Sequence, residues 1–270
     1  MEALPLLTIL AILLAGIVAS VMNSVVGAGT IVTFPVLVLL GMSPVEAVVA
    51  NTIGIVPGTL AGTWAYRSTL TGRGRTVGRL IIASTVGGVL GAFLLVLLPP
   101  GVFRAVVPLL LLFAGALAVL QPRIAAAVDL RRTRRADAGG PAHVAGRDRL
   151  TLPLVLAVGA TGVYGGYFGA AQGVLLLVTL GVFLGGSMND LNGIKNALAT
   201  TANVVSALVF ILYRGVVVDW RVVLIVAVAS TIGGTLGGTY GRRLSGDVLR
   251  VLIIVIAIAA AVYQQFFAVT

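Results

Sequence analysis

The chain has 270 residues, of which 59% are hydrophobic and 10% charged, and its mean hydropathy is +1.13. A soluble domain is about a quarter charged, so this composition excludes an ordinary soluble protein and indicates an integral membrane protein. Cysteine is absent, which excludes a disulfide, and His143 is the only histidine, so we expect no metal site and no other cofactor.

Apolar segments long enough to cross a bilayer, which takes about 20 residues, alternate with two shorter ones. They cover residues 4–26, 31–41, 44–66, 77–98 and 102–120, and then residues 151–168, 174–184, 188–213, 222–240 and 248–268. The first segment lacks the basic start and the cleavage site of a signal peptide, so we interpret it as a membrane segment. The two short segments each follow a glycine-rich break.

The two halves of the chain repeat the same order of segments. The stretch "ASTVGGVLGA" at 83–92 returns as "ASTIGGTLGG" at 229–238, and "SPVEA" at 43–47 aligns with "SMNDL" at 187–191. These matches predict an all-α polytopic membrane protein with two inverted repeats, each a glycine-broken helical hairpin plus three transmembrane helices. The repeats cover residues 1–121 and 151–270, and residues 122–150 are expected to be a polar loop that forms a cytoplasmic, arginine-rich linker.

The net charge of +10 comes from arginines that cluster in two hydrophilic segments, 67–79 and 123–149, without interleaved aromatic residues. This placement argues against a nucleic-acid partner, and the positive-inside rule puts both segments in the cytoplasm. If each glycine-broken unit enters and leaves on one face, or crosses twice, the halves are inverted. Both termini then lie outside, and Arg242, Arg243 and Arg250 lie inside. If the unit crosses once, those three arginines lie outside.

Two carboxylates lie beside membrane segments rather than in an evident loop. Glu46 and Asp190 each follow a serine by three residues, which is typical of a helix N-terminus. Helix capping is therefore one interpretation of both residues. The alternative is that they carry protons coupled to a transport step.

The segment 188–213 is polar along one helical face. Asn192, Asn196, Thr200 and Asn203 form a stripe at helical spacing, and Lys195, the only lysine in the chain, lies beside it. Hydrogen bonding between helices would explain the amides and hydroxyls. It does not explain a lysine about 12 Å from the start of the helix, where a lipid-facing cation would cost roughly 2.5 kcal/mol or more. No spare buried carboxylate is available, so we expect an anionic substrate to be the partner of Lys195.

The glycine breaks indicate the same kind of ligand. A broken membrane helix exposes backbone N–H groups at a half-helix N-terminus, where they and the helix dipole attract anions. Transporters place such breaks near the midplane at corresponding positions of two repeats. The candidate residues are Gly27, Gly29 and Thr30 in the first half and Gly169, Gln172 and Gly173 in the second. Elsewhere, glycines spaced by four predict close helix packing, and Pro57 predicts a kink.

The chain resembles the sulfite exporter TauE/SafE family of membrane transporters. The resemblance rests on "GAGTIVTFPVLVLLGMSPVEAVVANT" in the first half and on "GVYGGYFGAAQGVLLLVTLGVF" and "GIKNALATTANVVSALVF" in the second. The matching positions are Gly27, Gly29, Lys195, Asn196 and Asn203. The family implies transport of small sulfur-containing or organic anions such as sulfite, thiosulfate or sulfonates.

We therefore expect a secondary transporter that moves a small organic or sulfur-containing anion across the cytoplasmic membrane by alternating access. Lys195 would supply charge, and Asn196, Asn203, Asn51 and Thr52 would supply hydrogen bonds. Enzymatic activity is not expected, because the membrane segments contain no histidine, cysteine or paired aspartates. The alternatives are a passive anion channel and a membrane scaffold protein.

Overall fold

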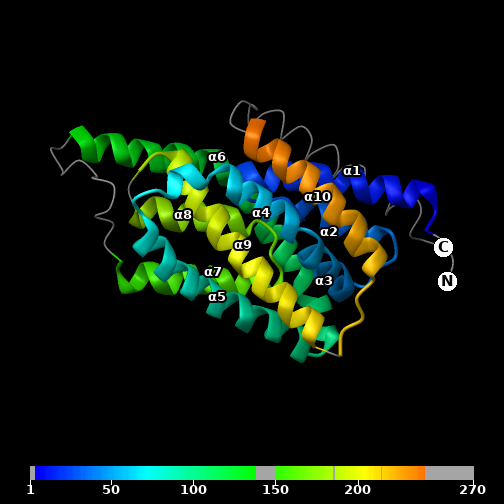
Figure 1. Ribbon diagram of the computed structural model, residues 1–270. Coiled ribbons are helices and arrows are strands. Elements are labelled where there is room, and N and C mark those ends of the chain that lie inside the picture. The colour runs from blue at the N-terminus through cyan, green and yellow to red at the C-terminus, as the bar shows by residue number, and fades with distance from the viewer. Residues whose placement is uncertain (1–3, 138–149, 185, 214, 241–270) are drawn as a thin grey trace.

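The computed structural model describes residues 4–137, 150–184, 186–213 and 215–240, and these are helical with no strand. The helices are α1 (Leu6–Val25), α2 (Thr30–Leu39), α3 (Pro44–Gly54), α4 (Val56–Ala65), the 3₁₀ turn η1 (Arg67–Leu70), α5 (Gly74–Leu97), α6 (Pro100–Asp137), α7 (Leu152–Tyr167), α8 (Gln172–Phe183), α9 (Met188–Leu212) and α10 (Trp220–Tyr240) (Figure 1). The all-α prediction is confirmed. The predicted segment 248–268 and Arg242, Arg243 and Arg250 lie outside the described residues.

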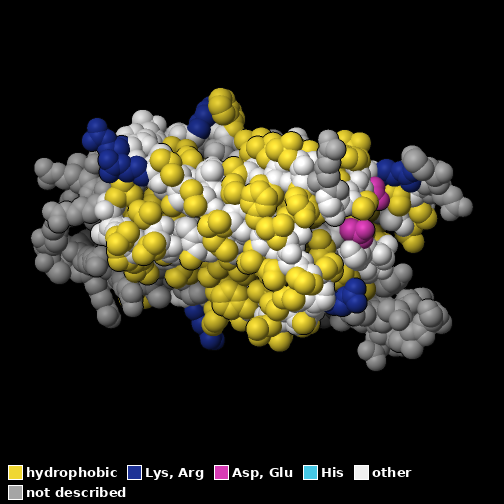
Figure 2. All heavy atoms as spheres, turned by 90° about the horizontal axis from the view of Figure 1, so that it is seen from below, with side chains coloured by type: hydrophobic (Ala, Val, Ile, Leu, Met, Phe, Trp, Pro, Cys, Tyr) yellow, Lys and Arg dark blue, Asp and Glu magenta, His cyan; other side chains and the backbone are white. Residues whose placement is uncertain are grey.

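Six of these helical segments are long and apolar enough to cross a membrane, counting α3 with α4 as one and only residues 100–121 of α6. The shorter apolar helices are α2, α7 and α8. Large hydrophobic side chains are exposed along the outside, Leu7 and Val119 among them. Figure 2 shows hydrophobic side chains over the middle of one face and charged ones around its margin. A bilayer would cover such a surface.

The two broken hairpins, α1–α2 and α7–α8, come one from each half of the chain. Figure 1 shows α1 and α7 starting at opposite ends of the molecule. Each packs against a helix of the other half, α1 along α10 and α7 along α5. Glycines permit this contact: a Cβ on Gly233 would collide with the Ile17 carbonyl oxygen, and one on Gly91 with the Val163 carbonyl oxygen. The glycine ladders therefore serve packing, and the inverted orientation of the repeats in the membrane stays a prediction.

Pro57 interrupts the third segment, as predicted. The helix breaks at Ile55, and α4 begins with the proline in its first turn. Ser230 of α10 bridges the break, because its hydroxyl donates to the Gly54 carbonyl at 2.8 Å and accepts from the Gly58 N–H at 3.3 Å. The backbone groups freed by the proline are thus satisfied from the other half of the chain.

The arginine-rich segment differs from its prediction as a loop. Helix α6 continues through residues 122–137, well beyond the expected end of the membrane segment. The prediction of a polar loop there was wrong because arginine, alanine and leucine are good helix formers even where hydropathy is low. The division into two repeats and a linker remains a prediction.

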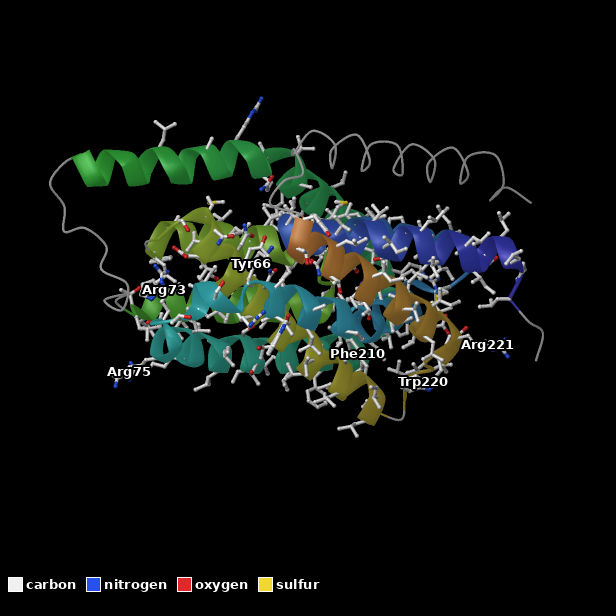
Figure 3. All side chains as sticks on the ribbon, turned by 45° about the horizontal axis from the view of Figure 1, so that its top comes forward. Tyr66, Arg73, Arg75, Phe210, Trp220 and Arg221 are labelled. Carbon is white, nitrogen blue, oxygen red and sulfur yellow. The ribbon has the colours of Figure 1, made fainter. Side chains whose placement is uncertain are left out.

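Arginines lie at both ends of the molecule. Figure 3 shows Arg73 and Arg75 near the end at which α6 finishes, whereas Arg221 lies at the opposite end. The described parts of the two arginine-rich segments, residues 67–79 and 123–137, therefore share one end, called here the arginine-rich end. This agrees with a common cytoplasmic location under the positive-inside rule.

The topology can be tested with introduced cysteines, because the native chain has none. We expect the thiols of Arg75→Cys and Ala142→Cys to resist an impermeant reagent in intact cells, and the thiol of Arg221→Cys to react. Inverted repeats also predict protection of Arg242→Cys. Reaction of Arg242→Cys from outside, with Arg75→Cys protected, would rule out the inversion.

Candidate functional site

The two glycine breaks meet in the centre of the molecule. The chain leaves helical geometry between α1 and α2 and again between α7 and α8, as predicted, and the second break contains Ala171 in the left-handed region at φ 58°. The Gly173 N–H donates to the Gly27 carbonyl oxygen at 3.0 Å. A Cβ on either glycine would collide with the α-carbon of the other, and Gly27 also has a φ of +84°. Only glycine fits this crossing of the two halves.

Lys195 lies beside this crossing and is fully buried. Its Nζ donates to the backbone carbonyls of Asn23 at 3.2 Å and Ser24 at 3.1 Å, and Asn196 Nδ2 donates to the Ser24 carbonyl at 3.3 Å. These carbonyls belong to the last turn of α1, where a helix presents unpaired oxygens and the negative end of its dipole.

The expectation that Lys195 lacks a protein partner was therefore wrong. It missed these carbonyls because it counted only carboxylates, and backbone groups do not show in a sequence as partners. An ammonium has three N–H donors, so the two bonds leave one donor available.

A small cavity of ≈ 10 Å³ adjoins Lys195. That volume holds about one water molecule. Its polar lining consists of Ser20, Asn23, Ser24, Thr59, Lys195 and Asn196, and most of the remaining wall consists of Gly27, Gly58, Gly62 and Gly173. Lys195 is the only charged residue among these described lining residues. The cavity therefore has a positive, hydrogen-bonding wall, the kind of wall that attracts an anion.

Four of the polar residues that line the cavity were not predicted. Ser20, Asn23 and Ser24 lie within one turn of each other on α1, and Thr59 lies on α4. The cluster on α1 was detectable, because three polar residues spaced by three and four interrupt an otherwise apolar helix. Thr59 gave no such signal, because its position depends on the packing of α4 against α9.

Thr200 of the polar stripe joins α9 to α4. Thr200 donates to the Thr59 carbonyl at 2.9 Å, and its oxygen lies 2.8 Å from the Thr63 hydroxyl. Because Thr200 uses its proton on the carbonyl, Thr63 is the donor in the second bond. Thr200 therefore fits the structural interpretation of the stripe. Asn203 is buried on the same helix but does not line the cavity.

The predicted residues Thr30, Asn51 and Thr52 are buried in the first half, away from the cavity lining. Thr33 donates to Asn51 Oδ1 at 2.6 Å, and Asn51 Nδ2 donates to Thr30 Oγ1 at 3.4 Å. These bonds tie α2 to α3 beside the first break.

Three predicted residues shape the breaks themselves. A Cβ on Gly29 would collide with the Ala19 carbonyl oxygen, so Gly29 allows α2 to approach α1, and Gly169 turns the chain at φ +77°. The Gln172 side chain packs onto Gly165, and its buried Nε2 has no hydrogen-bond partner. The Gly173 N–H is already used by Gly27, so it is not a free anion donor in this arrangement.

Glu46 and Asp190 both form capping boxes. The Ser43 N–H donates to the Glu46 carboxylate at 3.0 Å, and the Ser187 N–H to the Asp190 carboxylate at 2.8 Å. Each serine hydroxyl accepts the N–H of its acidic partner in return. The capping interpretation is confirmed for both residues, and a further role in proton coupling stays a hypothesis.

The family profile of the sulfite exporter TauE/SafE matches residues 12–264, which is nearly the whole chain. The chain belongs to the sulfite exporter TauE/SafE family. The assignment from the sequence is confirmed, and a member of this family with six candidate spans is a multi-pass cell membrane transporter.

Three proteins named as probable membrane transporters are similar to the chain over most of its length. The chain is 26% identical over 245 residues to the probable membrane transporter protein YfcA of Escherichia coli K12, covering 88% of this chain and 82% of the relative. It is 24% identical over 253 residues to a probable membrane transporter protein of Haemophilus influenzae, covering 93% and 92%. A Sinorhizobium protein, "Probable membrane transporter protein ORF9", is 23% identical over 252 residues, covering 92% and 88%. No solved structure matches the chain.

Proposed function

We propose that the protein is a secondary transporter for a compact anion, either an oxyanion of sulfur or a small organic sulfonate or carboxylate. One observation carries the proposal: Lys195 is the only charged side chain among the described residues lining the central cavity, and two of its three N–H donors are engaged. The third would bind the anion. Asn196 and Asn23 line the same cavity and would add hydrogen bonds.

The crossing of Gly27 and Gly173 supports alternating access as the mechanism. The two broken hairpins belong to different halves and touch through backbone atoms at this point. A rocking motion of one half against the other would open the contact from one side at a time. The anion would replace the Gly27 carbonyl as the partner of the Gly173 N–H, which would supply a donor at the N-terminus of α8.

The family name supports sulfur-containing anions as the substrate class. Geometry adds a limit on size, because the cavity is small and its wall contains four glycines. A passive anion channel is the alternative: a channel would conduct without saturation, whereas alternating access predicts saturable flux. We further propose that the protein catalyses no reaction, which agrees with its membership of a transporter family.

The proposal can be tested with a thermal-shift screen of the purified protein against sulfite, thiosulfate, sulfoacetate and lactate. A ligand that binds only the native state at a concentration 100 times its Kd adds about 2.7 kcal/mol to the free energy of unfolding. We expect at least one anion to raise the Tm in a saturable way, and chloride at equal ionic strength to have no such effect. A flat screen in both detergent and lipid nanodiscs would contradict the proposed substrate class.

A further inference from the structure

Opposite charges from the two halves approach each other at the arginine-rich end. Arg73, the residue before α5, is only 5% exposed although it is an arginine. A Cβ on Gly186 would collide with Arg73 Nη2 and would lie 2.9 Å from Asp190 Oδ2. The guanidinium of the first half and the carboxylate of the second half therefore lie on the same side of Gly186.

The opposite end of the molecule has the equivalent arrangement with different charges. Asp219 directly precedes α10, as Arg73 directly precedes α5, and its Oδ1 accepts the Arg221 N–H at 3.0 Å. Glu46 occupies the third position of α3, as Asp190 does in α9. The arginine-rich end brings together a cation and an anion, whereas this end brings together two anions with the cation Arg221 two residues beyond Asp219.

These two anions line one cavity. Glu46 and Asp219 face a space of ≈ 320 Å³ whose other walls include Ile12, Leu37 and Val222. Figure 3 places Trp220 and Arg221, the neighbours of Asp219, at the end opposite Arg73. The molecule is therefore packed over Arg73 at one end and hollow between Glu46 and Asp219 at the other.

We propose that these two pairs are the gates of the alternating-access cycle, with the gate of Arg73 and Asp190 shut and that of Glu46 and Asp219 open in this structure. The proposal rests on the transport function above. Opposite charges hold the first gate together, and burial of Arg73 limits screening by water. Glu46 and Asp219 do not attract each other across the second gate, and their repulsion is weak, because Asp219 is exposed and screened and Arg221 lies two residues beyond it.

Thiol labelling can test the gates without any anion. Thr8→Cys reports on the hollow end, because Thr8 lines the cavity there and is only half-buried. Leu184→Cys reports on the packed end, because Leu184 is buried in the same apolar cluster as Val77 and Leu191. In the otherwise native chain we expect a small thiol reagent to label Thr8→Cys and to spare Leu184→Cys.

Weakening the shut gate should reverse this pattern. Arg73→Gln and Asp190→Asn are each expected to increase labelling of the Leu184→Cys reporter by about fivefold or more, the lower end of typical coupling between sites, and to decrease labelling of the Thr8→Cys reporter. Asp219→Asn should act in the same direction but less strongly, and asparagine preserves the N-cap of α10. Arg75→Gln is the matched control, because Arg75 is an exposed arginine of the same segment and should change neither rate.

Two outcomes would overturn the gates. If Arg73→Gln and Asp190→Asn leave both labelling rates at the level of Arg75→Gln, Arg73 and Asp190 do not keep this end of the protein closed. If the thiol at position 184 becomes reactive while the thiol at position 8 keeps its rate, the packed end has only loosened locally. Because no anion is present in the assay, a failed anion screen would refute the substrate class and leave the labelling result intact.

Discussion

Gly27→Ala is expected to abolish accumulation of the folded protein or to lower its unfolding temperature more than any other single alanine substitution at a glycine. Two costs coincide at this position. The added Cβ would collide with the Gly173 α-carbon, and the backbone has a φ of +84°, which residues with a side chain avoid. Together they should cost about 3 kcal/mol or more. Fluorescence-detected size exclusion during a temperature ramp would measure the effect.

Alanine substitutions at three other glycines test the collision and the positive φ separately. Gly173→Ala meets the same collision without a positive φ, and Gly72→Ala meets a φ of +81° with no atom within 4 Å of the new Cβ. Gly115→Ala meets neither. We expect the decrease in unfolding temperature to be largest for Gly27→Ala, smaller for Gly173→Ala and smaller again for Gly72→Ala. Gly115→Ala should leave the unfolding temperature unchanged. Equal stability of Gly27→Ala and Gly115→Ala would contradict the close crossing of the two breaks.

Lys195→Met is expected to weaken anion binding by about 10- to 100-fold, the effect of losing a charged hydrogen bond worth about 1.5–3 kcal/mol. It should also destabilise the protein without ligand. Methionine leaves the Asn23 carbonyl without the donor it has in Lys195, whereas the Ser24 carbonyl keeps Asn196. An orphaned buried carbonyl costs about 1–3 kcal/mol. Relief of the buried charge acts in the opposite direction, but the α1 carbonyls already compensate that charge.

Two variants control this experiment. Lys195→Arg keeps the charge and the bonds to the carbonyls, but a guanidinium fills a cavity of ≈ 10 Å³, so binding should fall while stability is largely kept. Thr201→Ala alters the same helix outside the site, because its hydroxyl bonds the Ala197 carbonyl of its own helix at 2.9 Å. Anion affinity and Tm should be measured on the same samples. Native affinity in a folded Lys195→Met protein would refute Lys195 as the anion ligand.

Much of the architecture could be predicted from the sequence because its causes are local or periodic. Hydropathy located the membrane helices, Ser43 and Ser187 predicted the two capping boxes, and glycine clusters predicted both breaks. The one local failure was residues 122–137, where low hydropathy was interpreted as a loop although the helix propensity is high.

The chemistry of the site was only partly predictable. The sequence indicated that a lone lysine in a polar stripe must be buried, and it is. It could not indicate that the partners of that lysine are carbonyls of Asn23 and Ser24, more than 170 residues earlier. It also grouped Asn51 and Thr30 with Lys195. In the structure these two residues bond each other, and neither lines the cavity beside Lys195.

The sequence by itself thus determined the membrane class, the family, the helix boundaries near caps and breaks, and the identity of the charged residue in the interior. The tertiary structure alone decided which backbone atoms face Lys195, that Gly27 touches Gly173, and that Arg73 approaches Asp190. The physical reason is that a helix specifies its own hydrogen bonds over four residues. Contacts between the halves depend on how whole helices pack, and the unpaired carbonyls at a helix end are the same whatever residue carries them.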